Sequence, residues 1–260
     1  MKRTDPREDL VHYAHKVYHK GWVANHDGNL TIRLAADRIL STPTALSKGD
    51  VTANDLIVVD RKGTKVSGHR GAFSELALHL AAYEARADAR AVLHAHPPYA
   101  TALGVAGLDL ARPIIAEAVV SLGDCVPLIP FSLPKTPPWT GDVARAIVHY
   151  DALLLQNHGV ITCGDDLEQA FLRMELVEHL ARIVHHSMAF GGPSYLAPDT
   201  LPHLLAARTK AGLGPEARGL AAPPHTAAAA TAAATPTTHT PPDRVAQLVL
   251  EELRRLQQGH

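Results

Sequence analysis

The stretch ALLLQNHGVITCG, residues 152–164, decides the fold class of this sequence. Residues 152–157 form a continuous apolar run, as in a buried strand, and residues 159–164 have the pattern of a second strand. Because no helix separates the two, we expect them to pair antiparallel. Working outward, GNLTIRL (28–34) and RILST (38–42) are a second pair of predicted strands without a helix between them. The sequence therefore predicts a single α/β domain with a central, largely antiparallel sheet flanked by helices.

Helical segments surround these strands in the sequence. Apolar residues recur at helical spacing in residues 6–20, and Ser74 can cap a helix that reaches about residue 86. Asp165 or Asp166 can cap a long helix that reaches about residue 186. Further strands are predicted at 56–60, 91–96 and 126–130, and a further helix at 141–150.

The composition is that of an ordinary globular protein. Of the 260 residues, 46% are hydrophobic and 20% are charged, and the formal net charge is −1. Because the charges nearly balance and no apolar run could cross a bilayer, we expect neither a nucleic-acid nor a membrane partner. The charged first ten residues lack an apolar signal core, and the two cysteines, Cys125 and Cys163, are isolated. These features predict a cytoplasmic protein with reduced thiols.

The composition changes after residue 212. Residues 213–242 are rich in Ala, Pro and Thr, which predicts a flexible linker. In residues 243–260, apolar side chains return at helical spacing with Arg and Glu between them, which predicts an amphipathic helix. We therefore expect a folded domain at 1–212, a linker at 213–242 and a tethered helix at 243–260.

Three of the seventeen histidines stand where a metal site could form. His94 and His96 are two apart on a predicted strand, so their side chains point to the same face and can reach one ion. His158 follows a hydrophobic strand and precedes Gly159. Taken alone, His94 and His96 could be explained as a pair of surface histidines. Three histidines at two strand ends suit a divalent transition metal, and zinc leaves a fourth position open for a substrate.

Glu75 follows Ser74 at the predicted start of a helix. An acidic residue in a first turn is explained by its favourable interaction with the helix dipole. Beside a metal site, the same carboxylate becomes a candidate acid or base. The glycine turn before Asn29 is a weaker signal, since such turns are common before strands.

The ordered motifs GNLTIR (28–33), TPT (42–44), SE (74–75), HAHPPYATA (94–102) and NHG (157–159) resemble the class II aldolase/adducin family over residues 5–190. The resemblance implies a homotetramer with fourfold symmetry and active sites between subunits. It implies that His94, His96 and His158 bind one zinc ion per subunit. Glu75 would be the general acid/base, and would also ligate zinc when no substrate is bound.

The resemblance also implies a substrate-binding set of small residues, which would hold the phosphate of a sugar phosphate. Its members are Gly28, Asn29, Thr44 and Ser74.

Three positions depart from the pattern of the family's aldolases. His26, Ala45 and Phe73 stand where a threonine, a glycine and a serine are expected. Phe73 cannot donate a hydrogen bond to a phosphate, whereas His26 can. Glu117 falls where the family's fuculose-phosphate enzyme has a catalytic tyrosine from the neighbouring subunit, so it is a second catalytic candidate.

The resemblance thus implies a zinc-dependent aldolase that cleaves a ketose 1-phosphate of the fuculose or rhamnulose kind. Its products would be dihydroxyacetone phosphate and a small aldehyde such as lactaldehyde, with Glu75 moving the proton. Glu117 leaves open a sugar-phosphate 4-epimerase, a dehydratase of a thiosugar phosphate or a decarboxylase of a sugar acid. A non-catalytic, adducin-like assembly module is a further alternative, against which the metal set argues.

The tail carries a second resemblance. A linker of small residues followed by one amphipathic helix, at 243–260, is similar to the encapsulation peptides of bacterial microcompartment enzymes. The resemblance implies docking on a shell protein and a location inside the compartment, where an aldehyde product would be confined. A helix that folds back onto the protein's own tetramer is the alternative.

Overall fold

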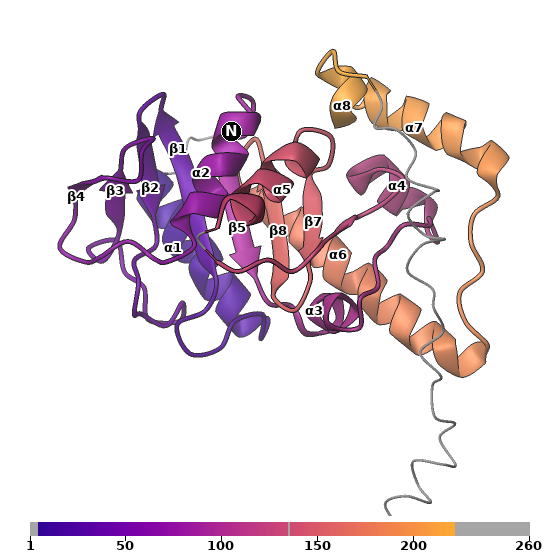
Figure 1. Cartoon of the computed structure of the whole chain (residues 1–260), viewed down its shortest axis with the longest axis horizontal. Helices are drawn as coiled ribbons and strands as arrows, with labels where there is room; N and C mark the ends of the chain where they lie inside the picture. The colour runs from indigo at the N-terminus through magenta and orange to yellow at the C-terminus, as the bar shows by residue number, and fades with distance from the viewer. Residues whose placement is uncertain (1–4, 135, 222–260) are drawn as a thin grey trace, which may run out of the picture. The chain divides into compact units, whose positions relative to one another are not determined.

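The computed structural model describes residues 5–134 and 136–221, and its centre is one mixed sheet of eight strands in the order β4-β3-β2-β1-β5-β8-β7-β6 (Figure 1). All neighbouring strands pair antiparallel except β6 and β7. The strands are β1 (Asn29–Ala35), β2 (Arg38–Ser41), β3 (Ile57–Val59), β4 (Lys65–Ser67), β5 (Ala91–Ala95), β6 (Leu128–Ile129), β7 (Ala152–Leu155) and β8 (Gly159–Gly164). The expected α/β domain with a largely antiparallel sheet is confirmed, although the strand expected at 126–130 is only two residues long.

Helices cover both faces of the sheet. One face packs against α1 (Pro6–His19), α3 (Pro98–Val105) and α6 (Leu167–Ser187), and the other against α2 (Leu76–Ala85) and α5 (Pro137–Ile147). The remaining helices are α4 (Ala116–Leu122), α7 (Leu201–Lys210), α8 (Gly214–Ala217) and the short 3-10 turns η1 (Met188–Phe190) and η2 (Pro198–Thr200). No helix among the described residues is long and apolar enough to span a membrane.

The period-two alternation of β5 directs one set of its side chains to each layer. Ala91, Leu93 and Ala95 join the apolar cluster under α1 and α6, whereas Val92 joins the cluster under α2 and α5. His94 alternates with Leu93 and Ala95, so it points toward the layer that contains α2. The start of α2 therefore lies on the same side of the sheet as the histidine.

The helix caps explain two of the boundaries. Asp166 is the N-cap of α6, and its carboxylate accepts a hydrogen bond from the Gln169 amide at 2.8 Å. At α2 the N-cap is Glu75, without a side-chain capping bond, so the expectation that Ser74 caps this helix is wrong. Leaving Ser74 outside the helix keeps its hydroxyl on an exposed loop.

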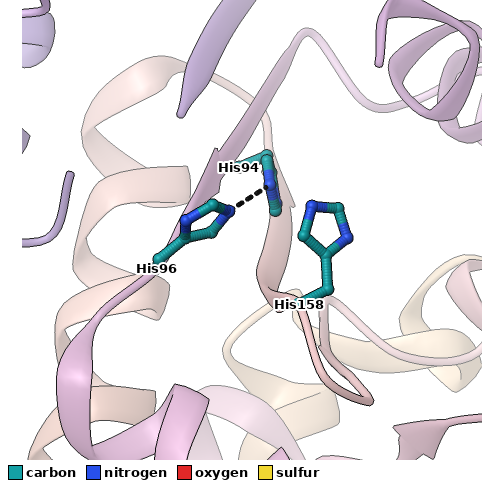
Figure 2. A group of neighbouring side chains, drawn as sticks. All are labelled: His94, His96 and His158. Atoms are coloured by element: carbon teal, nitrogen blue, oxygen red, sulfur yellow. Dashed lines mark hydrogen bonds between the residues drawn. The ribbon is translucent and has the colours of Figure 1, made fainter. Parts of the chain in front are cut away.

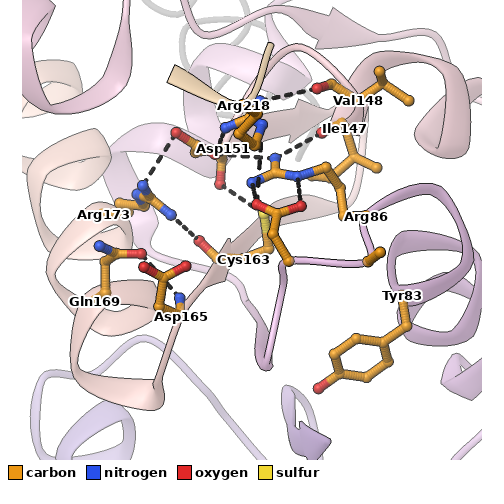
Figure 3. Close-up of polar contacts among 12 residues, drawn as sticks. Tyr83, Arg86, Ile147, Val148, Asp151, Cys163, Asp165, Gln169, Arg173 and Arg218 are labelled. Atoms are coloured by element: carbon orange, nitrogen blue, oxygen red, sulfur yellow. Dashed lines mark hydrogen bonds and ion pairs between the residues drawn. The ribbon is translucent and has the colours of Figure 1, made fainter. Parts of the chain in front are cut away.

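A buried ion-pair cluster around Asp151 joins the C-terminal helices to the sheet (Figure 3). The Asp151 carboxylate, fully buried before β7, contacts Arg86 at 3.0 Å and Arg173 at 3.1 Å. From α7, Arg208 approaches it to 2.6 Å, and Arg218, just after α8, to 3.4 Å. Burial alone would raise the pKa of Asp151, but the four guanidinium groups hold it below the ordinary value.

The surplus positive charge of this cluster lies at helix ends. Arg208 donates to the carbonyls of Val120 and Ser121 in the last turn of α4, and Arg218 donates to the carbonyl of Val148 after α5. Helix C-termini carry partial negative charge and favour cations. The packed domain thus continues past residue 212 through α8, within the range expected to be a linker. The rest of that range and the helix expected at 243–260 lie outside the described residues.

Candidate metal and catalytic site

Strand pairing brings the three histidines together (Figure 2). His94 is on β5, His96 directly follows that strand, and His158 lies in the turn between β7 and β8. Because β5 pairs with β8 through Ala95 and Val160, the turn before β8 lies next to the end of β5. The ring centroids of the three imidazoles are 4.6–5.3 Å apart.

The donor atoms suit one metal ion. Nε2 of His94 lies 3.1 Å from Nε2 of His96, and one ligand nitrogen from each histidine lies within 4.8 Å of the others. Tetrahedral zinc with Zn–N bonds of about 2.0–2.1 Å separates two ligand nitrogens by about 3.3 Å. In the part of the chain that the structure describes, this is the one group of three His, Cys, Asp or Glu residues so arranged. Three imidazoles are a ligand type that suits zinc, and the distance between His94 and His96 is close to that of a zinc site.

A second contact fixes the orientation of the His94 ring. His94 donates its Nδ1 hydrogen to the Val160 carbonyl at 2.9 Å, because a carbonyl can only accept, so in the neutral ring its Nε2 carries a lone pair, which faces Nε2 of His96. The Nδ1 atom of His96 lies 3.7 Å from the carboxylate of Asp27. Burial lowers the pKa of both His94 and His96, which favours the neutral imidazole that binds metals.

Glu75 reaches the group from the start of α2. Its Oε1 atom lies 2.6 Å from Nε2 of His158, and its Oε2 atom lies 3.5 Å from Nε2 of His94. Oε2 also accepts a hydrogen bond of 2.8 Å from the side-chain amide of Asn29. Burial would raise the pKa of Glu75, but the neighbouring imidazoles and hydrogen bonds lower it overall. Glu75 therefore lies beside His94 and His158 within a single chain, as the sequence led us to expect.

Two glycines permit the close approach of these elements. A Cβ atom on Gly159 would lie 2.5 Å from the Ala95 carbonyl oxygen and 2.5 Å from Cδ2 of His96. Gly28 has φ +70°, and a Cβ there would lie 2.4 Å from Val23. Asn157 holds the left-handed φ of +54° that Asn tolerates better than most residues. The NHG motif thus provides the turn geometry as well as the histidine of the three-histidine group.

Of the residues expected to bind phosphate, Thr44 and Ser74 lie on two adjacent loops, whereas Asn29 is the first residue of β1. The Thr44 amide donates to the Gly71 carbonyl at 3.0 Å, which holds the loop of Thr44 against the loop that carries Ser74. Both Thr44 and Ser74 are exposed. The amide of Asn29, in contrast, is buried and already engaged by protein groups.

The three residues that depart from the pattern of the family's aldolases lie in different surroundings. Phe73 is buried and packs edge-on against His79, with ring centroids 5.2 Å apart, so it faces the core. Ala45 adopts φ +55° in place of the expected glycine. His26 is exposed, and its carbonyl accepts a hydrogen bond from Lys48.

Sequence reasoning missed two buried groups near the site. Lys48 is fully buried, donates to the carbonyls of His26 and Leu46 at 3.0 Å, and burial lowers its pKa to about 8. His79 is buried four residues after Glu75 and bonds to Asn29. Its spacing of four from Glu75 places both on one helix side, which was the signal available in the sequence.

Glu117 is not brought to the histidines within this chain. It is exposed on α4, and among the described residues no hydrogen bond or ion pair joins it to His94, His96 or His158. Two apolar hollows adjoin the site. One, of about 190 Å³, lies beside His158 and Trp139, and the other, of about 600 Å³, lies beside His96 and Trp22.

Comparison with known proteins gives consistent matches. Residues 8–185 match the sequence model of the family described as "Class II Aldolase and Adducin N-terminal domain". The chain is 32% identical over 182 residues to 3-oxo-tetronate 4-phosphate decarboxylase of Escherichia coli K12, which covers 68% of this chain and 85% of the relative. It is also 32% identical over 200 residues to L-fuculose phosphate aldolase of the same strain, which covers 76% and 91%. A solved L-fuculose 1-phosphate aldolase superposes with a TM-score of 0.73 at 27% identity, covering 82% of this chain and 99% of that one.

Proposed function

Because the chain belongs to the class II aldolase and adducin family, we propose that it is a zinc-dependent aldolase. Its substrate would be a ketose 1-phosphate of the fuculose or rhamnulose kind, cleaved to dihydroxyacetone phosphate and a small aldehyde such as lactaldehyde. The observation that carries this proposal is the Glu75 carboxylate, 2.6 Å from His158 and 3.5 Å from His94, at the edge of a three-histidine group. The similarity to an L-fuculose phosphate aldolase supports the reaction class.

The metal would be held by His94, His96 and His158. A bound zinc ion would supply a Lewis acid that draws electron density from a substrate carbonyl. The exposed hydroxyls of Thr44 and Ser74 suit the phosphate end of the substrate, since both can donate hydrogen bonds to it.

Cleavage between C3 and C4 of such a ketose needs two proton transfers. A proton leaves the C4 hydroxyl as that carbon becomes the aldehyde, and a proton is added at C3 of the other product. Glu75, beside the histidines, is placed to carry out one transfer. Glu117 is exposed, and no hydrogen bond or ion pair joins it to the three histidines of its own chain among the described residues. The other transfer would therefore use Glu117 of the partner subunit. This division of labour requires the homotetramer implied by the family.

A decarboxylase is the second candidate, favoured by the 32% identity to 3-oxo-tetronate 4-phosphate decarboxylase. Loss of carbon dioxide from a 3-oxo acid also leaves an electron pair on a carbon next to a carbonyl group. The same carboxylate, Glu75, could then return a proton to that carbon. The two reactions therefore make similar demands on the site.

Product analysis tests the proposal. Zinc-loaded protein would be incubated with a panel of ketose 1-phosphates and, separately, with 3-oxo-tetronate 4-phosphate, with the Glu75→Gln variant as the matched control. We expect dihydroxyacetone phosphate and an aldehyde in equal amounts from a ketose 1-phosphate. Carbon dioxide from the oxo acid alone would establish the decarboxylase instead. Three results would overturn both the aldolase and the decarboxylase. A C4-epimerised sugar would favour the epimerase, a dehydrated product would favour the dehydratase, and no turnover would favour the assembly module.

The tail extends the proposal to location. We propose that residues 243–260 dock on a shell protein of a bacterial microcompartment, which would place the enzyme in the compartment lumen. An isolated helix of this length is marginal in water, so its apolar stripe gains stability when a partner buries it. Confinement of a reactive aldehyde would be the benefit of this placement.

A further inference from the structure

A line of buried hydrogen bonds runs from Glu75 into the core between β1 and α2. The side-chain nitrogen of Asn29, Nδ2, lies 2.8 Å from Oε2 of Glu75, and the side-chain oxygen of Asn29, Oδ1, lies 2.6 Å from Nε2 of His79. Nδ1 of His79 lies 2.8 Å from the Thr31 hydroxyl, which lies 2.9 Å from the Tyr83 hydroxyl. Asn29, Thr31 and His79 are each at most 3% exposed.

The Glu75 carboxylate, at one end of the line, fixes which group donates in every hydrogen bond. The Glu75 carboxylate can only accept, so Asn29 donates with its NH₂ group and keeps its oxygen as an acceptor. His79 must then donate its Nε2 hydrogen to that oxygen. A neutral imidazole accepts at the remaining nitrogen, so Thr31 donates to Nδ1 and accepts from the Tyr83 hydroxyl. Burial lowers the pKa of His79 to about 3, which is consistent with a neutral ring.

We propose that His79 is a positioning residue for Glu75, acting through Asn29. The inference rests on the proposed role of Glu75 as acid/base. An amide side chain can turn by 180° and exchange its oxygen and nitrogen, and an Asn29 oxygen directed at the carboxylate would repel it. The Nε2 hydrogen of His79 selects the orientation in which Asn29 donates. Oε2 of Glu75 is thereby held, and Oε1 faces His158.

The departure at residue 73 fits the same arrangement. Phe73 packs edge-on against the His79 ring at 5.2 Å between centroids, and both side chains are buried. A serine there would leave space beside the imidazole. Phe73 therefore restricts the ring from one side while Thr31 and Asn29 restrict its two nitrogens.

The test compares three variants of the full, zinc-loaded chain. His79→Gln can keep a donor near the position of Nε2, whereas His79→Leu removes it. Tyr83→Phe is the matched control, because it removes the last hydroxyl of the line and leaves the bonds from Thr31 to Glu75 intact. We expect His79→Leu to lower kcat at least about tenfold, since a small misplacement of a catalytic group is costly, with zinc content unchanged. KM should change less than about threefold, because only catalysis is affected. His79→Gln should recover most of kcat, and Tyr83→Phe should keep it.

A second readout needs no substrate. In nitrogen-15 NMR spectra, His79 should show the tautomer protonated at Nε2, and the Asn29 side chain should give one pair of amide signals. In His79→Leu these Asn29 signals should broaden or double, while His79→Gln should restore the single pair.

The outcomes separate this inference from the proposed function. An unchanged kcat in His79→Leu, a His79→Gln variant no better than His79→Leu, or unchanged Asn29 signals would overturn the positioning role. Normal NMR behaviour without turnover of any substrate would instead overturn the proposed function. If His79→Leu does not fold, the comparison of His79→Gln with the unmodified chain decides, and a tautomer protonated at Nδ1 would overturn the inference.

Discussion

At the scale of single residues, the candidate site joins three histidines to a carboxylate held from two sides. His94 is oriented by the carbonyl of Val160, and Glu75 is held by Asn29 on one oxygen and His158 on the other. Preorganisation of this kind lowers the cost of ordering the groups during reaction. Substitutions here should therefore affect metal binding and turnover more than folding.

The metal assignment is tested at His96. Replacement by Ala removes one of the three proposed ligands, so we expect zinc and activity to be lost together. Zinc per subunit would be measured by mass spectrometry, with exposed His12→Ala on α1 as the control. A His96→Ala protein that kept one zinc ion per subunit would show that the ion lies elsewhere.

The acid/base assignment is tested at Glu75. Glu75→Gln keeps the shape but cannot take up a proton, so turnover should fall by about 10² or more, the usual contribution of a positioned acid/base. The measurement is kcat of protein shown to be folded and zinc-loaded. Near-normal turnover would leave Glu75 only the role of a carboxylate at a helix start.

At the scale of elements, local patterns predicted some features of the site but not the contacts between distant segments. The two-residue spacing of His94 and His96 predicted a shared face, and the strand pair at 152–164 predicted the antiparallel sheet. His79 escaped prediction because its partner Asn29 lies 50 residues away in the sequence. The place of Glu75 beside the histidines came from the family resemblance, since nothing in its own helix specifies it.

The β7–β8 turn offers a test of how closely these elements must approach. In Gly159→Ala the new Cβ would meet the Ala95 carbonyl and the His96 ring at 2.5 Å, so the two strand ends must move apart. We expect zinc affinity to fall about tenfold to hundredfold, as for loss of a group that orients a ligand, and the melting temperature to fall. Gly141→Ala in α5 is the control, since its Cβ would meet only the end of the Arg145 side chain. Equal zinc affinity in both variants would show that the close approach is not required.

At the scale of the whole molecule, the Asp151 cluster connects parts of the domain that are far apart in the sequence. It joins Arg86 after α2 with Arg208 and Arg218 of the C-terminal segment, and Arg208 also contacts the end of α4. Since α4 carries Glu117, the C-terminal helices hold the element that the proposed mechanism needs at a subunit boundary.

Asp151→Asn tests this cluster. Removing the charge leaves the buried guanidinium groups of Arg173 and Arg208 without a carboxylate partner, a type of change that costs about 3–5 kcal/mol. The pH dependence follows from the lowered pKa of Asp151 in the folded state. Its stabilisation is fully present above the unfolded value of about 3.9 and is lost as pH falls through the lower folded value. Urea unfolding between pH 3 and 7 should show that Asp151→Asn has a lower free energy of unfolding than the unmodified chain and loses less of it at acid pH. A pH profile identical to that of the unmodified chain would contradict a stabilising role of the cluster.

The tail gives the last test, because it separates a docking device from a part of the fold. A chain cut after residue 220 keeps Arg218 and the contacts of α7 and α8, so we expect unchanged activity, oligomeric state and melting temperature. It should no longer co-purify with co-expressed microcompartment shell proteins. The full-length control carries Leu248→Glu and Leu253→Glu, which disrupt the predicted apolar stripe without shortening the chain, and it should lose the shells in the same way. If the cut chain unfolds or loses its tetramer, the terminal helix packs on its own protein and the docking proposal fails. If both variants still co-purify with shells, the contact lies on the catalytic domain.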